Sequence, residues 1–203
     1  MRPTSDTRIV AATLDLMRSG GPRAVTIEAV AAHAGVARTT IYRRYADREE
    51  MLHAALEVLA DPEPMPALST PEERLRWVIV TATDIVVSGI GFGGLAALIT
   101  GSDPAFSDAF RDVLTRHRSA LTAAIEEGIA EGSFRADLEP ETFVDGIVGV
   151  LVSECARTGG ISDDYEERLV TLFLPTARTG QERPRHPHRS GESFIHAVDG
   201  ESA

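Results

Sequence analysis

Four side chains between residues 38 and 43 have the types and the spacing that reading DNA requires. Arg38, Thr39, Tyr42 and Arg43 stand at positions i, i+1, i+4 and i+5, so a helix through them would present all four on one outward face. Arginine can donate two hydrogen bonds to the edge of a guanine, and the hydroxyls of threonine and tyrosine suit phosphate oxygens. This face therefore predicts contact with double-stranded DNA.

Two short helices joined by a tight turn, predicted over residues 26–45, would hold this face toward DNA. Thr26 can cap the first helix, and Gly35 can supply the turn because glycine tolerates a positive φ. The second helix is expected over about residues 37–45. Residues at helical spacing would pack inward on both helices: Ile27, Val30, Ala31, Ala34, Val36, Ile41 and Tyr45.

The rest of the chain is also predicted to be helical, with no regular repeat and no convincing series of strands. Gly20-Gly21-Pro22 ends the first helix, and the proline-rich stretch 61–70 marks a linker. We predict an all-α fold with an N-terminal three-helix DNA-binding domain over residues 1–60, a second helical domain over residues 61–177, and a disordered tail over residues 178–203. Beyond the helix-turn-helix, the expected helices run over about 4–19, 47–60, 71–88, 92–100, 104–131, 139–158 and 163–177.

Charge and composition narrow the class of protein. The net charge of −11 argues against a general nucleic-acid coat, but the distribution is uneven. Residues 1–60 carry eight arginines against seven acidic residues, whereas residues 61–203 carry twelve against twenty-four. Cys155 is the only cysteine, which excludes an intramolecular disulfide, and no long apolar run or signal-peptide core is evident. We expect a cytoplasmic protein without a membrane partner.

The run AGVARTTIYRRYADREEML, residues 34–52, closely resembles the TetR family of repressors. The family pattern is an Ala-Gly-Val turn, a Thr-Leu-Tyr core, an aromatic residue, a Lys-Glu pair and a leucine, and the weaker resemblance extends back to residue 7. Two positions depart from it: Ala37 stands where a helix-capping serine is usual, and Arg48 replaces lysine. The resemblance implies phosphate contacts for Thr26, Thr40, Tyr42 and Arg48, and base contacts for Arg38, Thr39, Arg43 and Arg44.

The resemblance also implies that the second domain binds a small molecule and forms a homodimer through helices 139–158 and 163–177. The residues support the dimer independently, because the first of these helices is apolar nearly all round and must be buried on all sides. A central helix within one subunit is the alternative. The apolar positions are Phe143, Val144, Ile147, Val148, Val150, Leu151 and Val152 on one helix, and Tyr165, Leu169, Leu172 and Phe173 on the other.

The ligand site is harder to place from sequence. His117 falls among apolar residues of the long helix, where it is either a ligand contact or a satisfied core residue. Residues 77–88 present a mixed face that could line a cavity or be half exposed. The candidate ligand-binding residues are Trp77, Thr81, Asp84, Phe92, Phe106, Phe110 and His117.

One motif suggests a different class of protein. Residues 89–94 satisfy G-x-G-x-x-G, but a dinucleotide site needs a parallel βαβ unit, and a charged amphipathic helix follows instead. No catalytic constellation stands out, so we expect no enzyme activity, no cofactor and no metal.

The prediction is a regulator, in the first instance a repressor that a small molecule releases from a pseudo-palindromic operator. Three alternatives stay open: an activator or co-repressor-dependent regulator, a helical ligand-binding protein without DNA binding, and an enzyme with a cofactor at residues 89–94.

Overall fold

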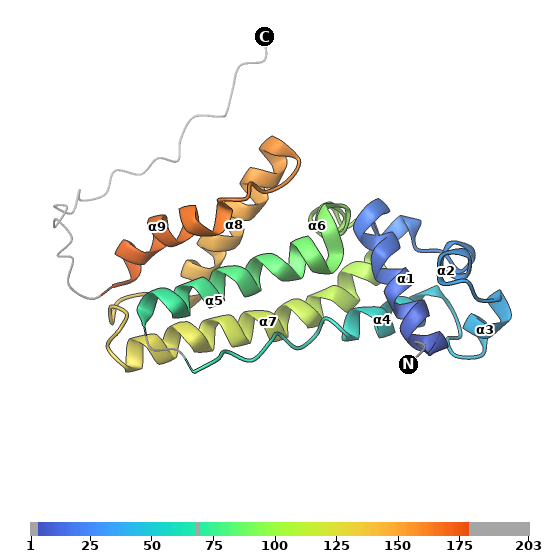
Figure 1. Ribbon diagram of the computed structural model, residues 1–203, viewed down its shortest axis with the longest axis horizontal. Coiled ribbons are helices and arrows are strands. Elements are labelled where there is room, and N and C mark those ends of the chain that lie inside the picture. Colours follow the sequence, from blue (N-terminus) through green and yellow to red (C-terminus); the bar gives the residue numbers. More distant parts are fainter. Residues whose placement is uncertain (1–3, 68–69, 179–203) are drawn as a thin grey trace, which may run out of the picture.

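The computed structural model describes residues 4–67 and 70–178, and its architecture over these ranges is helical (Figure 1). An isolated bridge between Phe134 and Arg178 is the only β interaction in the described chain. The elements are α1 (Ser5–Gly20), a 3-10 turn η1 (Pro22–Ala24), α2 (Ile27–Ala34), α3 (Arg38–Tyr42), α4 (Arg48–Glu57), α5 (Pro71–Asp84), a π-helix η2 (Ile85–Ile90), α6 (Gly91–Thr100), α7 (Pro104–Ala130), α8 (Pro140–Thr158) and α9 (Tyr165–Ala177).

Helices α1 to α4 form a small group at one end of the molecule (Figure 1). The ends of these helices follow from local chemistry. The Thr26 hydroxyl accepts a hydrogen bond from the Ala29 amide at 3.1 Å, and Gly35 ends α2 with φ of 63°. Asp47 caps α4 in the same way. Fully buried side chains from all four helices fill the space between them: Ile9, Met17, Val30, Ile41 and Leu52.

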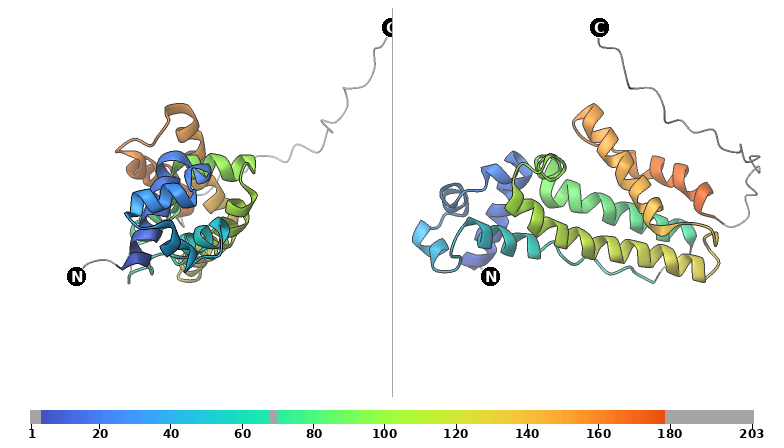
Figure 2. Two further views of the ribbon diagram at one scale, coloured as in Figure 1. Left: turned by 90° about the vertical axis from the view of Figure 1, so that its right-hand side faces the viewer. Right: turned by 180° about the vertical axis from the view of Figure 1, so that it is seen from behind.

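Helices α5 and α7 run side by side along the length of the molecule; α8 packs against both of them, and α9 packs against α5 (Figures 1 and 2). The core of this part is aromatic as well as aliphatic. Phe106 and Phe110 of α7 stack with ring centroids 5.6 Å apart, and Phe143 of α8 meets Phe173 of α9 edge-on at 5.4 Å. This packing fixes the position of α7, on which the predicted ligand residue His117 lies.

The two halves of the chain are packed tightly against each other where α1 meets α6 and α4 meets α7. Glycines make the first contact possible. A Cβ atom on Gly91 would lie 2.7 Å from the Arg18 carbonyl oxygen, and one on Gly93 would lie 2.8 Å from the Gly21 amide nitrogen. Gly91 also has a positive φ of 68°, so a larger residue there would be strained as well as crowded.

The predicted helices agree with the structure except near a few ends. The second helix of the helix-turn-helix stops at Tyr42 rather than residue 45, and α4 stops at Glu57 rather than residue 60. Residues 85–88, expected to continue α5, instead belong to the π-helix. The glycine motif at residues 89–94 spans the end of this π-helix and the start of α6, so it lacks the strand that a dinucleotide site needs. Beyond Arg178, the predicted disordered tail lies outside the described residues.

Within the described chain, one helical stretch, Pro71–Thr100, is long enough and apolar enough to cross a membrane. Its mean hydropathy is 1.7 over the most apolar window. Of that window, 56% is buried inside the protein, where α5 packs against α7, α8 and α9. Its apolar character is accounted for by this role as a core helix.

Candidate functional site

The recognition surface predicted from sequence is centred on α3. Ile41 is fully buried and anchors this short helix, while Arg38, Thr39 and Arg43 are exposed and Tyr42 is 55% exposed. No side chain caps the amino end of α3, because Ala37 occupies that position. The face that spacing predicted is therefore present and open to solvent, and Tyr45 is half buried against the core beside it.

Two of the arginines near this surface already have acidic partners. Arg38 donates to Glu28 at 3.2 Å, and Arg44 donates to Asp6. A backbone hydrogen bond and then the Arg38 contact lower the pKa of Glu28. Both ion pairs are exposed and therefore weak, so DNA phosphates could displace the carboxylates. Arg43 makes no side-chain bond to any described residue, and its guanidinium is free for a ligand.

The predicted phosphate contacts fall into two environments. Thr26 is exposed at the amino end of α2; its oxygen accepts from Ala29, which leaves the hydroxyl hydrogen available. Thr40 is half buried on α3. The amino ends of helices attract phosphate, which favours Thr26 as a backbone contact.

Arg48, for which the resemblance implies a phosphate contact, is hydrogen-bonded within the protein. Its Nε donates to the Val25 carbonyl oxygen at 2.7 Å, and one terminal nitrogen donates to the Pro22 carbonyl oxygen and to Asp103, both at 2.6 Å. Its side chain is only 28% exposed and that of Asp103 only 11%. A phosphate contact would require breaking these bonds. In this structure Arg48 joins the turn before α2 to the start of α7.

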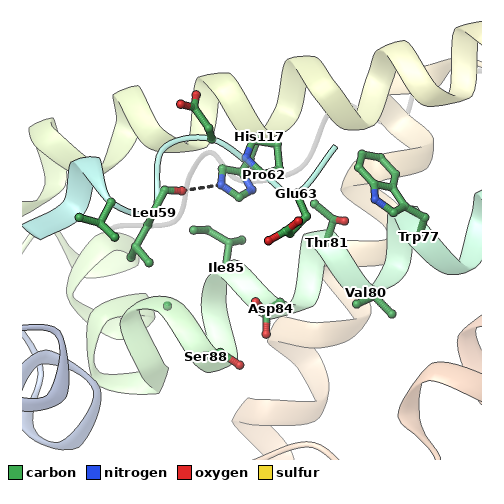
Figure 3. A pocket seen from close by; sticks show the side chains of 13 residues that line it. Leu59, Pro62, Glu63, Trp77, Val80, Thr81, Asp84, Ile85, Ser88 and His117 are labelled. Carbon is green, nitrogen blue, oxygen red and sulfur yellow. Dashed lines mark hydrogen bonds between the residues drawn. The ribbon is translucent and has the colours of Figure 1, made fainter. Parts of the chain in front are cut away.

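A cavity of about 300 Å³ lies between α5, α7 and the segment that follows α4 (Figure 3). His117 of α7 forms one wall, and its Nε2 donates to the Leu59 carbonyl oxygen at 2.7 Å. Its Nδ1 is buried and has no partner among the described residues. The lining residues are Val58, Leu59, Asp61, Pro62, Glu63, Trp77, Val80, Thr81, Asp84, Ile85, Ser88, Gly89 and His117.

A second cavity, of about 410 Å³, lies on another side of α7, against α5 and α8. His117 contributes to both cavities, but the second is mainly apolar and carries two arginines. One of these, Arg118, is bonded to Asp145. The lining residues are Ala82, Ile85, Val86, Arg111, Leu114, Thr115, His117, Arg118, Leu121, Val144, Asp145 and Val148.

Four of the predicted ligand residues, Trp77, Thr81, Asp84 and His117, line the first cavity together. The three phenylalanine candidates do not. Phe106 and Phe110 are fully buried and stacked in the core of α7, and Phe92 is half buried near the end of α8. The sequence pattern correctly placed Phe106 and Phe110 on one face of α7 with His117, but that face packs into the core over its first two turns.

Two family models match this chain. The one described as "Bacterial regulatory proteins, tetR family" covers residues 9–55, and the one described as "Tetracyclin repressor-like, C-terminal domain" covers residues 75–173. The chain belongs to the TetR family of transcriptional regulators. Its N-terminal helix-turn-helix and C-terminal helical domain are those of a TetR regulator.

Relatives extend the likeness over most of the chain. The HTH-type transcriptional regulator YdeS of Bacillus subtilis is 24% identical over 173 residues, which cover 80% of this chain and 84% of that protein. The structure of FadR from Bacillus subtilis, in complex with stearoyl-CoA, matches with a TM-score of 0.62 and 19% identity over 83% of this chain and 97% of that one.

A third relative is a transcriptional regulator from Saccharomonospora viridis whose structure was solved in complex with choline. It matches with a TM-score of 0.64 and 17% identity, over 87% of this chain and 98% of that one. At these identities the two solved structures show that the TetR fold is shared.

Several residues at both sites of this TetR regulator were missed by sequence reasoning. Pro62 and Glu63 come from the proline-rich stretch that was predicted only as a linker, and Leu59 from the predicted end of the helix before it, yet all three line the cavity. Glu28 and Asp6, the partners of the recognition-surface arginines, lie 10 and 38 residues away from them in the chain. The proline pattern DPEP favours an extended segment, but it gives no signal for what that segment packs against.

Proposed function

We propose that this TetR regulator is a repressor that binds a pseudo-palindromic operator as a homodimer and is released from it by a small molecule. The observation that carries the proposal is that the lining of the 300 Å³ cavity is hydrogen-bonded to α1 and includes the residues that directly follow α4. Gly89 in the cavity wall accepts a hydrogen bond from Arg18 of α1 at 3.3 Å, and Leu59, which follows α4, accepts from His117.

DNA binding is supported by the exposed face of α3. Arg43 is free to donate to a base edge, Arg38 and Arg44 can exchange exposed carboxylates for DNA, and Tyr42 can donate its hydroxyl to phosphate. Thr39 is expected to face bases, and Thr26 and Thr40 to bind phosphate. Two copies of α3 would have to enter successive major grooves about 34 Å apart, which requires a dimer.

A homodimer through α8 and α9 is supported by what these helices leave uncovered. Leu172 is 57% exposed, and small or apolar residues accompany it on the outer side of the pair. Such an apolar surface is typical of an interface between subunits. The residues concerned include Gly149, Val152, Ala156, Leu172 and Pro175.

Leu172→Asp tests this interface, since a carboxylate cannot be buried there without a partner. We expect the variant to sediment as a monomer and to bind operator DNA at least tenfold more weakly. Ile99→Asp is the matched control, because Ile99 is an equally exposed aliphatic residue on α6, at 64%. A dimeric Leu172→Asp variant with unchanged DNA affinity would place the interface elsewhere.

Release of the protein from DNA by a ligand follows from the thermodynamic linkage between the two binding events. A molecule that fills the cavity can push α5, α7 and the residues after α4 apart, and the bonds of Arg18 and His117 transmit that displacement to α1 and α4. Any ligand that prefers the displaced arrangement must weaken DNA binding by the same factor that DNA weakens ligand binding. The choline and stearoyl-CoA complexes of similar proteins support a small-molecule site on this scaffold.

The test is a gel-shift titration of the full chain against its own upstream intergenic DNA, beside a scrambled fragment of equal length, at fixed physiological salt. We expect binding to the native DNA to be at least tenfold tighter. Expression of the downstream gene in a strain that lacks this protein then shows the direction of regulation. Increased expression supports a repressor, and decreased expression supports an activator. Equal weak binding to both fragments would contradict regulation from this site.

The family, together with the charge and cysteine content, supports action in the cytoplasm by binding rather than catalysis. Among the described residues no cluster of three or more His, Cys, Asp or Glu side chains could hold a metal ion.

A further inference from the structure

We propose that Arg8 of α1 is a further DNA contact, which binds a phosphate of the DNA backbone beside the bases that α3 reads. This contact adds α1 to the DNA interface of the proposed function, and it rests on that function because it needs α3 to face DNA. The described residues 4–60 contain seven arginines: Arg8, Arg18, Arg23, Arg38, Arg43, Arg44 and Arg48.

These arginines differ in whether the protein already uses their guanidinium groups. Five of them donate from the side chain to another described residue: Arg18, Arg23, Arg38, Arg44 and Arg48. The exposed side chains of Arg8 and Arg43 form no hydrogen bond or ion pair with a described residue. Arg8 therefore shares with Arg43, the arginine expected to reach a base edge, a guanidinium that is free for a ligand.

The lack of an acidic partner for Arg8 contrasts with the acidic character of the chain. The sequence has 31 acidic residues against 20 arginines, for a net charge of −11. The acid closest to Arg8 in sequence is Asp6, and its carboxylate is bonded to Arg44. An exposed guanidinium that no described carboxylate neutralises can release counterions from DNA when it binds a phosphate.

Arg8 lies at the edge of the recognition surface. Its Nη1 atom is 3.9 Å from the point that a Cβ atom on Gly35 would occupy, at the turn between α2 and α3. Asp6, two residues earlier, is bonded to Arg44, which follows α3. The start of α1 therefore reaches the chain on both sides of α3 and lies beside that helix (Figures 1 and 2).

This position suits a phosphate rather than a base. A recognition helix enters the major groove, and the elements that flank it meet the sugar-phosphate backbone along the edges of the groove. Phosphate contacts carry no sequence information, but they fix the orientation of the protein on the duplex. A contact from Arg8 would thus increase affinity for any DNA and hold α3 in register with its bases.

The experiment is a fluorescence anisotropy titration of the full chain and its Arg8→Ala variant at salt concentrations from about 50 to 200 mM. The two DNAs are the native upstream fragment and the scrambled fragment. At about 100 mM salt we expect Arg8→Ala to bind both about threefold to tenfold more weakly. The slope of log affinity against log salt should become shallower by about one for each bound copy of the chain.

Two results with Arg8→Ala would overturn the proposal. Unchanged affinity and slope would leave Arg8 as a solvated surface residue. A loss confined to the native fragment would contradict a phosphate contact, because it would mean that Arg8 reads a base. Arg8 is exposed on α1 and alanine favours helices, so thermal melting should show that the variant is folded.

Two further variants separate a phosphate contact from a general effect of charge. Arg8→Lys keeps the charge, so it should keep the salt slope and most of the affinity of the parent protein. Arg111→Ala is the matched control, because it removes an exposed arginine, 61% in its side chain, from α7, outside the DNA-binding helices. A loss in Arg8→Lys or in Arg111→Ala as large as that in Arg8→Ala would overturn the proposal.

The scrambled fragment separates failure of this proposal from failure of the proposed function. A parent protein without preference for the native fragment, weakened on both DNAs by Arg8→Ala, would support the contact and contradict the regulator. A parent protein with a clear preference, unaffected by Arg8→Ala, would support the regulator and contradict the contact.

Discussion

Two arginines, one in each half of this molecule, differ in solvent exposure and in hydrogen bonding. Arg43, near the end of α3, is exposed and forms no side-chain bond to a described residue. Arg74, on α5, has a side chain that is 6% exposed and donates to the Ala124 carbonyl oxygen at 3.0 Å, to Glu127 at 3.1 Å and to Glu131 at 2.8 Å. The first is available to a ligand, and the second holds α5 to α7.

The comparison shows that the residue type alone does not indicate a role. An exposed guanidinium keeps its hydration until DNA replaces it, whereas a buried one must be satisfied by the protein itself. Arg48 lies between these extremes, because it belongs to the DNA-binding half by sequence but is bonded to Asp103 of the other half.

The largest expected effect on stability is that of Arg74→Met. Methionine can fill much of the same space, but the Ala124 carbonyl oxygen loses the donor that Arg74 supplies and two ion pairs disappear. We expect a loss of about 2–3 kcal/mol in the free energy of unfolding, measured by urea denaturation. Operator affinity of the folded protein should be unchanged.

Arg76→Met is the matched control on the same helix. Arg76 pairs with Glu166, Glu167 and Glu72, and its side chain is 31% exposed. Its pKa is raised by these carboxylates, Glu167 first. More exposed pairs of this kind contribute less than about 1 kcal/mol. A larger loss of unfolding free energy for Arg76→Met than for Arg74→Met would contradict the idea that the more buried arginine contributes more to stability.

The second prediction concerns Arg43, the exposed arginine of this comparison, and its contact with DNA. Arg43→Ala should weaken operator binding by about 1–3 kcal/mol in a gel shift, with a smaller loss on scrambled DNA and little change in unfolding free energy. Arg111→Ala on α7 is the control, because Arg111 is also an exposed arginine, 61% in its side chain. The same loss on both DNAs would contradict base reading by Arg43.

The third prediction tests the bond between the halves. Asp103→Asn keeps an oxygen that can accept from the Phe106 amide and so cap α7, but it loses the ionic contact with Arg48. We expect about 1 kcal/mol of lost stability, because the pair is partly buried. We also expect a ligand to change operator affinity less than in the parent protein. An unchanged ligand response would show that Arg48 and Asp103 are only structural.

The smallest effect is a difference in pH dependence within the C-terminal half. Glu154 accepts from Arg168 at 2.5 Å and from the Ser162 amide at 3.0 Å, and these contacts, Arg168 first, lower its pKa from 4.5 to about 2. Since the pKa is lower when folded, the stabilisation is present above pH 4.5 and is lost as the pH falls toward 2.

We therefore expect the urea midpoint of the parent protein to fall more steeply below pH 4.5 than that of Glu154→Gln. The two midpoints should differ most at neutral pH and converge in acid. Parallel curves across this range would mean that Glu154 contributes no pH-dependent stability.

The sequence by itself determined the helices and the recognition surface of this protein. Thr26, Gly35 and Ala37 act on their immediate neighbours, so the cap, the turn and the uncapped start of α3 could be predicted from local chemistry. The exposure of Arg43, which directly follows α3, was predicted from the helical period of residues 37–45.

Only the tertiary structure decided which of these residues meet others far away in the chain. Leu59 and His117 are 58 residues apart, and Arg48 and Asp103 are 55 apart, yet each pair is hydrogen-bonded. Periodicity shows which face of a helix is apolar but not what covers it, which is why Phe106 is a core residue while His117 borders a cavity. Packing between distant segments, rather than local preference, chose the partners at both sites.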